Sequence, residues 1–585
     1  MGRVLVILAV LAALCATTFL WTLGTAESPA DFTFVNRGEL RTLDPNRMSW
    51  LEDIRIGYAL WEGLYALEPK TLEPIPGAAS EIDLTPDRRG YTFHIRPEAR
   101  WSNGDPLKAG DFVFAWRRML EHPGDYSYLF SCIRGARQYQ QAYAVLQQRY
   151  DKEKPGRWSV TSSNQALFVP DPRPTGDAEF ASVEIAIPDD KTLVVSLDSP
   201  VPYFPDLCAF PPFWPLHEPS MREFWNDQTH AYDTKFTRPP YLVTNGPFRL
   251  TKWEFRRRMR LEANPNYWDI AHVKSRVIEV LPAEDAMWGF LKYESGAADW
   301  LPDAAGAIGA ELWAQKRPDL HVYPAFGTYF YTLNCREKFS NGTPNPLADV
   351  RVRLALSMAV DRRSIVQTIT RLGEQSAGHF IPVGVFPTYH SPPGVEYDPK
   401  RAAELLAAAG YPGGRGFPAI GILFNTEFHH GDVAQMIRRQ WLENLGIDVG
   451  LEGVEVKLFR QRLQQKDYAI ARASWYGDYN DPSTFTDKYR STSENNDAGW
   501  ISKPFDQLCD AALAEPDSAR RMDLFRQAEQ LLLQQQPIIP LYHTVNVCLF
   551  RPNIKGLELT PRNMVQLKSV YVEKPDAAGH RQNER

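Results

Sequence analysis

Cysteine is scarce in this sequence, and its positions do not match a metal site. Six cysteines occur among 585 residues, and no two of them are spaced as Cys-x-x-Cys. Because zinc sites need closely spaced thiolate or imidazole ligands, we expect neither a metal nor a cofactor. If Cys15 is removed with a leader, five cysteines remain and one thiol stays unpaired. A disulfide such as Cys132 with Cys208 is compatible with an oxidising compartment, although spacing does not fix the connectivity.

Long basic runs are also absent. The net charge is -6, and the only run of three consecutive arginines spans residues 256–258. Nucleic-acid surfaces need clustered Lys and Arg to neutralise phosphates, so we expect no nucleic-acid partner. The arginine run is interpreted as the solvated face of a hairpin.

The usual catalytic signatures are missing as well. There is no Gly-x-Ser-x-Gly elbow, no His-Glu-x-x-His, no phosphate-binding loop and no calcium loop. The glycine-rich residues 410–416 follow a predicted helix rather than a strand, which favours a helix stop over a dinucleotide cradle. Asp478 and Asp481 could in principle act as an acid and base pair. Nothing else supports catalysis, so an enzyme is not expected.

The amino terminus has the pattern of an export signal. Residues 4–23 are almost unbroken apolar, Arg3 precedes them, and Gly24, Thr25 and Ala26 follow as a small-residue cleavage site. We therefore predict a secretory leader over residues 1–26. An uncleaved membrane anchor is the second interpretation, because about 20 apolar residues can span a bilayer. Lipidation at Cys15 is the third, and the bulky Leu14 before it argues against it.

The remaining chain is long enough for three to four domain-sized units. Period-two patterns predict strands near residues 32–35, 91–96, 191–197 and 276–281, and a hairpin over 247–262. From residue 329 onward helical and strand patterns alternate, which indicates an α/β unit. Residues 140–180 combine an amphipathic helical half with a Pro-rich linker at 170–174, and we interpret them as a surface insertion.

The most unusual stretch is residues 472–485, Arg-Ala-Ser-Trp-Tyr-Gly-Asp-Tyr-Asn-Asp-Pro-Ser-Thr-Phe. We find neither helical nor strand periodicity in it. Aromatic rings interleaved with Asp478 and Asp481 could line a pocket that offers charge at fixed points and apolar faces elsewhere. The stretch is therefore the first candidate for a ligand site.

A set of segments in a fixed order resembles the bacterial oligopeptide-binding proteins, the family 5 extracytoplasmic solute-binding components of peptide ABC transporters. The resemblance covers nearly everything from about residue 31 to about residue 571. The segments that carry it are residues 37–45, 61–65, 91–96, 101–106, 111–116, 245–250, 264–268, 349–362, 409–417 and 472–485.

This resemblance implies a two-lobed α/β fold of the periplasmic-binding-protein type (type II), with an extra subdomain on the first lobe. Lobe I is expected from residues 27–58, 183–326 and 545–585, the subdomain from 59–182, and lobe II from 327–544. The hinge is expected near residues 325–328 and 543–546. The protein would bind an oligopeptide between the lobes and deliver it to a membrane permease, as an exported periplasmic or extracytoplasmic monomer.

The resemblance also implies a ligand site. Asp478 matches the acid in Trp-x-x-Asp-Tyr-Asn-x-Pro that holds a peptide's ammonium group, with Trp475 as a pocket wall. Ser474 and Tyr476 could present main-chain groups to an extended ligand. Arg472 and His430 resemble residues that bind the peptide's carboxylate, and Glu39 matches a ligand-side acid. Relatives carry aromatic or basic residues at the positions of Val456 and Leu463, so the carboxylate end is the less certain match.

Each of these residues also has a purely structural interpretation. Asp478 could bond its own turn, Trp475 could be ordinary core, and His430 and Glu39 could be solvated surface residues. At the level of function, another solute such as a nickel chelate, a sugar or a murein peptide stays open, because one fold hosts many ligands. An anchored enzyme or sensor is the alternative from a different class.

Overall fold

The computed structural model describes residues 27–153, 156–160, 166–170, 176–226, 231–304 and 306–574. The predicted leader, residues 1–26, lies outside them. No helix within these ranges is long and apolar enough to cross a membrane.

The largest element is an 11-stranded sheet with the order β12-β13-β14-β1-β15-β21-β16-β20-β18-β19, to which β17 adds beside β21. Its strands are β1 (Phe32–Arg37), β12 (Phe248–Glu254), β13 (Arg258–Ala263), β14 (Val277–Ala283), β15 (Trp300–Leu301), β16 (Leu320–Leu333), β17 (Gln375–Ser376), β18 (Gly421–Asn425), β19 (Gly450–Val454), β20 (Ile470–Tyr476) and β21 (Ile538–Phe550). The sheet therefore contains strands from both predicted lobes.

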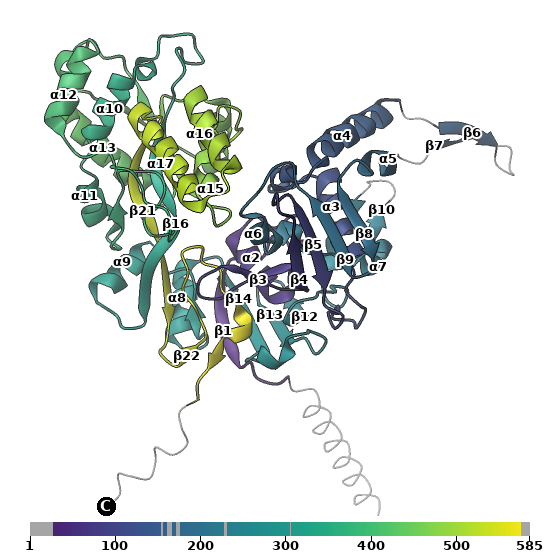
Figure 1. The fold of residues 1–585 in the computed structure, drawn as a ribbon. Helices are drawn as coiled ribbons and strands as arrows, with labels where there is room; N and C mark the ends of the chain where they lie inside the picture. The colour runs from purple at the N-terminus through teal and green to yellow at the C-terminus, as the bar shows by residue number, and fades with distance from the viewer. Residues whose placement is uncertain are drawn as a thin grey trace, which may run out of the picture.

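Two long antiparallel strands, β16 and β21, join the two parts of this sheet (Figure 1). Their register shifts twice, between Pro324 and Thr328 and again between Tyr329 and Phe330. At the first and wider shift, residues 325–327 of β16 lie opposite the single residue Thr544 of β21, whose hydroxyl donates to the carbonyl of Gly327 at 3.1 Å. This irregularity lies within the segments for which we expected the crossing between lobes. Below, lobe II means residues 327–544 and lobe I means the other described residues.

A second sheet, in the order β4-β5-β9-β8, lies in lobe I. It is formed by β4 (Ala79–Leu84), β5 (Gly90–Ile95), β8 (Ile185–Asp189) and β9 (Thr192–Ser196), next to α3 (Ala109–Glu121) and α4 (Ala136–Glu153). Asp111 supports the start of α3, since its carboxylate accepts the backbone N–H of Lys108 at 2.9 Å. Because β9 pairs with β5, this sheet extends past the predicted subdomain boundary at residue 182.

The predicted insertion contains a hairpin beyond α4. Strands β6 (Gly156–Val160) and β7 (Ala166–Pro170) pair antiparallel, and they project away from the body of lobe I (Figure 1). The short elements elsewhere in lobe I are β2 (Tyr65–Leu67), β3 (Pro74–Pro76), β10 (Trp225–Asn226), β11 (Ala231–Tyr232), β22 (Ile554–Lys555), β23 (Tyr571–Val572), α2 (Leu51–Leu60), α5 (Asp177–Phe180), α6 (Phe204–Cys208), α7 (Glu218–Met221), α8 (Ala286–Glu294) and α9 (Ala307–Ala314).

Helices surround the lobe II end of the large sheet (Figure 1). They are α10 (Val350–Met358), α11 (Arg362–Ile365), α12 (Pro399–Ala408), α13 (His430–Leu445), α14 (Val456–Gln465), α15 (Ser483–Thr486), α16 (Lys503–Ala514) and α17 (Ser518–Gln535). The hydrophobic core is split in the same way: its largest cluster lies in lobe I and the two next largest lie in lobe II. Tyr479 is an exception, because it comes from lobe II yet packs in the lobe I cluster.

The cysteine prediction is wrong where it allowed a disulfide between Cys132 and Cys208. All five cysteines after the leader carry free thiols in the structure. Cys132 instead donates its thiol to the carbonyl of Leu129, and burial raises the pKa of Cys132 to about 12.

A buried ion pair supports the segment that follows β20. Both carboxylate oxygens of Asp481 accept from the guanidinium of Arg521 in α17, at 2.6 and 2.9 Å, and the two side chains are only 6% and 5% exposed. The backbone N–H of Ser483 donates to the same carboxylate at 3.0 Å. Asp481 is thus structural, which removes it from the candidate acid and base pair.

Replacing Asp481 with Ala should destabilise the protein by about 3–5 kcal/mol, because it leaves the guanidinium of Arg521 buried without a partner. Asp523→Ala is the matched control, since Asp523 pairs with Arg526 at the surface and such pairs contribute less than about 1 kcal/mol. Urea unfolding followed by circular dichroism measures both. Equal unfolding midpoints for the two variants would contradict the structural role of Asp481.

Candidate functional site

The candidate site lies at the end of β20 that leads into residues 477–485. The prediction that this stretch has no strand character is wrong for its first half, because β20 pairs with β16 from Ile470 to Tyr476. A central strand is covered on both faces, so its side chains need not alternate between apolar and polar. Its conformation is set by the neighbouring strands.

One edge of β20 is open beside the site. On the β18 side, pairing covers only Ile470 and Ala471, so residues 472–476 have no strand partner there among the described residues. The backbone N–H of Gly477 donates to the carbonyl of Phe326 at 2.9 Å, which fixes the alternation along β20. Because main-chain groups of successive strand residues point to opposite edges, those of Ser474 and Tyr476 face the open edge. The Tyr476 side chain is 52% exposed.

Trp475 supports the segment after the strand. Its indole N–H donates to the carbonyl of Thr484 at 2.7 Å, and the ammonium of Lys488 lies 4.7 Å from the ring centroid. The side chain is half-buried and packs against the second lobe II core cluster. These contacts are compatible with Trp475 forming a wall of the ligand pocket while it also packs against the lobe II core.

Asp478 lies where lobe II meets lobe I. Its carboxylate accepts the phenolic O–H of Tyr128 from lobe I at 2.8 Å, and its backbone N–H donates to the hydroxyl of Thr484 at 2.9 Å. The side chain is half-buried. Burial raises the pKa of Asp478 to about 6, against the opposing effects of the Tyr128 hydrogen bond and of the nearby Arg562.

Lobe I also holds the backbone around Asp478. Arg562 donates to the carbonyl of Asp478 at 3.0 Å and forms a buried ion pair with Asp206 at 2.7 Å. The other oxygen of Asp206 accepts the backbone N–H of Asn480 at 3.1 Å. Tyr479 stacks on Tyr203 with ring centroids 4.1 Å apart. Sequence reasoning missed these lobe I residues, since they lie far from Asp478 in the sequence, 84 positions away for Arg562, and carry no motif.

Arg472 and His430 form a second group, around Tyr329. The guanidinium of Arg472 donates to the side-chain oxygen of Asn425 and lies 5.0 Å from the ring of Phe459. Among the described residues it forms no ion pair with a carboxylate. The Nδ1 atom of His430 lies 3.0 Å from the Tyr329 hydroxyl. Burial, with Arg472 nearby, lowers the pKa of His430 to about 3, so this imidazole is neutral near pH 7.

Glu39 is engaged elsewhere in lobe I. Its carboxylate accepts the indole N–H of Trp253 at 2.5 Å and the backbone N–H of Arg256 at 2.7 Å. These contacts fix the turn of the β12-β13 hairpin. No hydrogen bond or ion pair in the described part of the chain joins Glu39 to Asp478 or Arg472, so its predicted ligand role gains no support.

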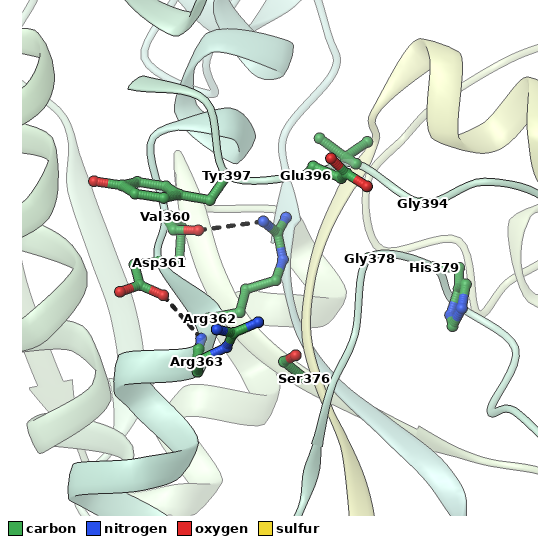
Figure 2. A pocket seen from close by; sticks show the side chains of 11 residues that line it. Val360, Asp361, Arg362, Arg363, Ser376, Gly378, His379, Gly394, Glu396 and Tyr397 are labelled. Atoms are coloured by element: carbon green, nitrogen blue, oxygen red, sulfur yellow. Dashed lines mark hydrogen bonds between the residues drawn. The ribbon is translucent and has the colours of Figure 1, made fainter. Parts of the chain in front are cut away.

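A cavity of about 670 Å³ opens elsewhere in lobe II (Figure 2). Two of its charged side chains form hydrogen bonds to backbone groups. Asp361 accepts the N–H of Arg363 at 3.0 Å, and Arg362 donates to the carbonyls of Val360 and Pro540. None of the predicted site residues lines it. Within the described ranges, no cluster of His, Cys, Asp and Glu could hold a metal ion.

Comparison with known families identifies the family to which the chain belongs. The model for bacterial extracellular solute-binding proteins, family 5 Middle, matches residues 73–497, which is more than half of the chain. The chain belongs to this family.

Relatives within family 5 are similar along most of their length. The oligopeptide-binding protein OppA of Bacillus subtilis is 30% identical over 512 residues, which cover 85% of each chain. The periplasmic murein peptide-binding protein MppA of Escherichia coli is 28% identical and covers 92% of each.

Solved structures of family 5 proteins confirm the predicted two-lobed α/β fold. The Escherichia coli murein tripeptide binding protein MppA superposes with a TM-score of 0.73 at 26% identity, covering 94% of this chain and 99% of that one. Haemophilus influenzae OppA in complex with RPPGFSPFR gives a TM-score of 0.70 at 25% identity, covering 94% and 100%.

Replacing Tyr128 with Phe should raise the pKa of Asp478 above its value of about 6, because the lost hydrogen bond stabilises the ionised carboxylate. Carbon-detected NMR titration of protein labelled at the Asp carboxyl carbons measures this value, with Asp478→Asn to assign the signal. Tyr126→Phe is the control, since Tyr126 also lies near Asp478 but makes no hydrogen bond to its carboxylate in the structure. An unchanged titration in the Tyr128 variant would contradict the contact.

Proposed function

We propose that this protein captures oligopeptides between its lobes and delivers them to the permease of an ABC transporter outside the cytoplasmic membrane. The observation that carries the proposal is the open edge of β20 at Ser474 and Tyr476, which ends two residues before the Asp478 carboxylate. Membership in family 5 and the peptide ligands named for its relatives OppA and MppA support it.

Recognition would act first on the peptide backbone. An extended ligand can add to the open edge of β20 through N–H and C=O groups that every peptide carries, so binding need not depend on one side chain. Ser474 and Tyr476 would supply the main-chain groups. The exposed ring of Tyr476 would then contact a ligand side chain.

Asp478 would bind the ligand's α-ammonium group. A buried ammonium loses hydration, and a carboxylate beside it offsets that cost. In the structure the carboxylate already accepts from Tyr128 of the other lobe and has further lone pairs for a ligand cation. A ligand held there would contact both lobes, which is how a ligand favours the closed form of a hinged protein.

Arg472 would contact the ligand's carboxylate. Burial lowers the pKa of Arg472, and no carboxylate of the described chain offsets its charge by direct contact. A ligand carboxylate would stabilise this guanidinium by a charge-assisted hydrogen bond. His430 would act as a neutral hydrogen-bonding group rather than as a second cation, because its Nδ1 side is occupied by Tyr329.

The register shift between β16 and β21 is the proposed hinge. Residues 325–327 and Thr544 can change dihedral angles with less loss of ladder hydrogen bonds than a regular strand pair would suffer. We further propose that the protein is an exported monomer, and that the ATPase of the transporter does the chemical work.

Replacing Asp478 with Asn should weaken binding of a free-amino tetrapeptide about 10- to 100-fold, because a charge-assisted contact is lost. Binding of the N-acetylated peptide should be weak for both proteins and nearly equal. Isothermal titration calorimetry measures all four combinations. If the free-amino peptide binds the variant as tightly as the wild type, the role of Asp478 is wrong.

The affinity of the wild type for the free-amino peptide should fall as the pH drops below about 6. The ligand's ammonium group favours the ionised carboxylate, so protonation of Asp478 competes with binding, whereas the α-amino group of the ligand stays charged at these pH values. The Asp478→Asn variant should lack this dependence. Native mass spectrometry of purified protein tests the broader proposal: absence of co-purified peptides together with no binding of any peptide would overturn it.

A further inference from the structure

We propose that Arg41, Trp50 and Arg460 form an anion-binding subsite that takes a carboxylate of the ligand, with one cation from each lobe. The inference rests on the proposed function and deepens it, because it adds selection for a carboxylate-bearing peptide. The carboxylate is either the ligand's carboxyl terminus or an Asp or Glu side chain near that end.

The guanidinium groups of both arginines contact the indole ring of Trp50. The guanidinium carbon of Arg41 lies 3.6 Å from the ring centroid of Trp50, and that of Arg460 lies 5.9 Å from it. Both distances are within the range of cation–π contact. The two guanidinium carbons are therefore no farther apart than the sum of these distances. Since Arg41 and Trp50 belong to lobe I and Arg460 to α14 of lobe II, the cluster spans both lobes.

Helix α14 (Val456–Gln465) connects this cluster to the Arg472 end of the candidate site. Arg460 directly follows Phe459, and the ring of Phe459 lies 5.0 Å from the guanidinium of Arg472. An extended ligand that starts at Asp478 and follows the edge of β20 past Ser474 runs toward Arg472, because Arg472 comes earlier in the same strand. The subsite is thus placed at the carboxylate end of such a ligand.

Helix α14 explains why a cation at residue 460 can serve where positions 456 and 463 lack one. Val456, Arg460 and Leu463 are spaced i, i+4 and i+7, which places them on one face of the helix. Leu463 packs against a small core cluster with Phe459, whereas Arg460 is exposed. On this face of the helix, Arg460 therefore supplies a positive charge one turn after Val456.

Both arginines lack an internal anion. Neither forms an ion pair among the described residues, whereas neighbouring arginines such as Arg462 do. Asp53 accepts the backbone N–H of Arg41 at 2.9 Å, not its guanidinium, and burial raises the pKa of Asp53 to about 7. Two like charges on one ring repel each other, and an anion between them would offset the repulsion. A planar guanidinium can bind a carboxylate through two parallel hydrogen bonds.

The test compares Arg460→Gln and Arg41→Gln with the wild-type protein on four matched tetrapeptides. The peptides carry either a free carboxyl terminus or a terminal amide, and either Glu or Gln as the last side chain. Arg439→Gln is the control, because it removes an equal charge from an exposed position of α13. Isothermal titration calorimetry at low and at high salt gives the affinities, and circular dichroism checks that each variant is folded.

We expect each site variant to weaken binding of one pair of peptides, either the two free acids or the two Glu peptides, about 5- to 10-fold at low salt and less at high salt, and to leave the amide peptide with Gln unchanged. A loss confined to the free-acid pair identifies the carboxyl terminus as the source, and a loss confined to the Glu peptides identifies the side chain. Equal losses for all four peptides, or losses matched by Arg439→Gln, would overturn the subsite. A wild type that binds the peptides but does not distinguish acid from amide or Glu from Gln would also overturn it, whereas a wild type that binds none of them would overturn the proposed function itself.

Discussion

The pairing of β16 with β21 is the constraint on which the site depends. These two strands continue one sheet across both lobes, and β20 is registered on β16 from Gly327 opposite Tyr476 to Leu333 opposite Ile470. The end of β20 therefore coincides with the register shift of the long pair. Asp478 lies just beyond that end, so any change of angle at residues 325–327 would move it relative to Tyr128.

Buried charges then fix the segment beyond the strand. Arg521 holds Asp481 from the lobe II side, while Asp206 and Arg562 hold the backbone of Asn480 and Asp478 from the lobe I side. Fixing these groups removes water from around Asp478, and the same desolvation raises the pKa of its carboxyl. Burial of this segment thus both holds it in place and disfavours the ionised form of the Asp478 carboxylate. A ligand cation would stabilise the ionised carboxylate without breaking the contacts that hold the segment.

Local pattern was enough to predict most elements of the fold. The strands near residues 32, 91 and 276 appear where periodicity placed them. The strand at 470–476 was missed because its conformation comes from β16, far away in sequence. Tyr128 and Arg562 were missed for the same reason: each gains its role only when the lobes come together. The ligand role of Glu39 stays a prediction, which came from its motif position, whereas the structure shows its carboxylate bonded to the nearby hairpin.

The two ends of the proposed ligand site differ in how the protein's own groups satisfy their charges. At the Asp478 end, Tyr128 already donates to the carboxylate, while Thr484 and Arg562 bond only the main chain, so a ligand ammonium competes with or adds to an existing contact of the charged group. At the other end, Arg472, Arg460 and Arg41 have no carboxylate partner in the described chain, within a protein whose net charge is -6. A ligand anion bound there would give these arginines the carboxylate partner that the described residues do not provide. Discrimination between ligands should therefore be sharper at the carboxylate end, because uncompensated charge distinguishes an acid from its neutral analogue more strongly than a charge that is already hydrogen-bonded.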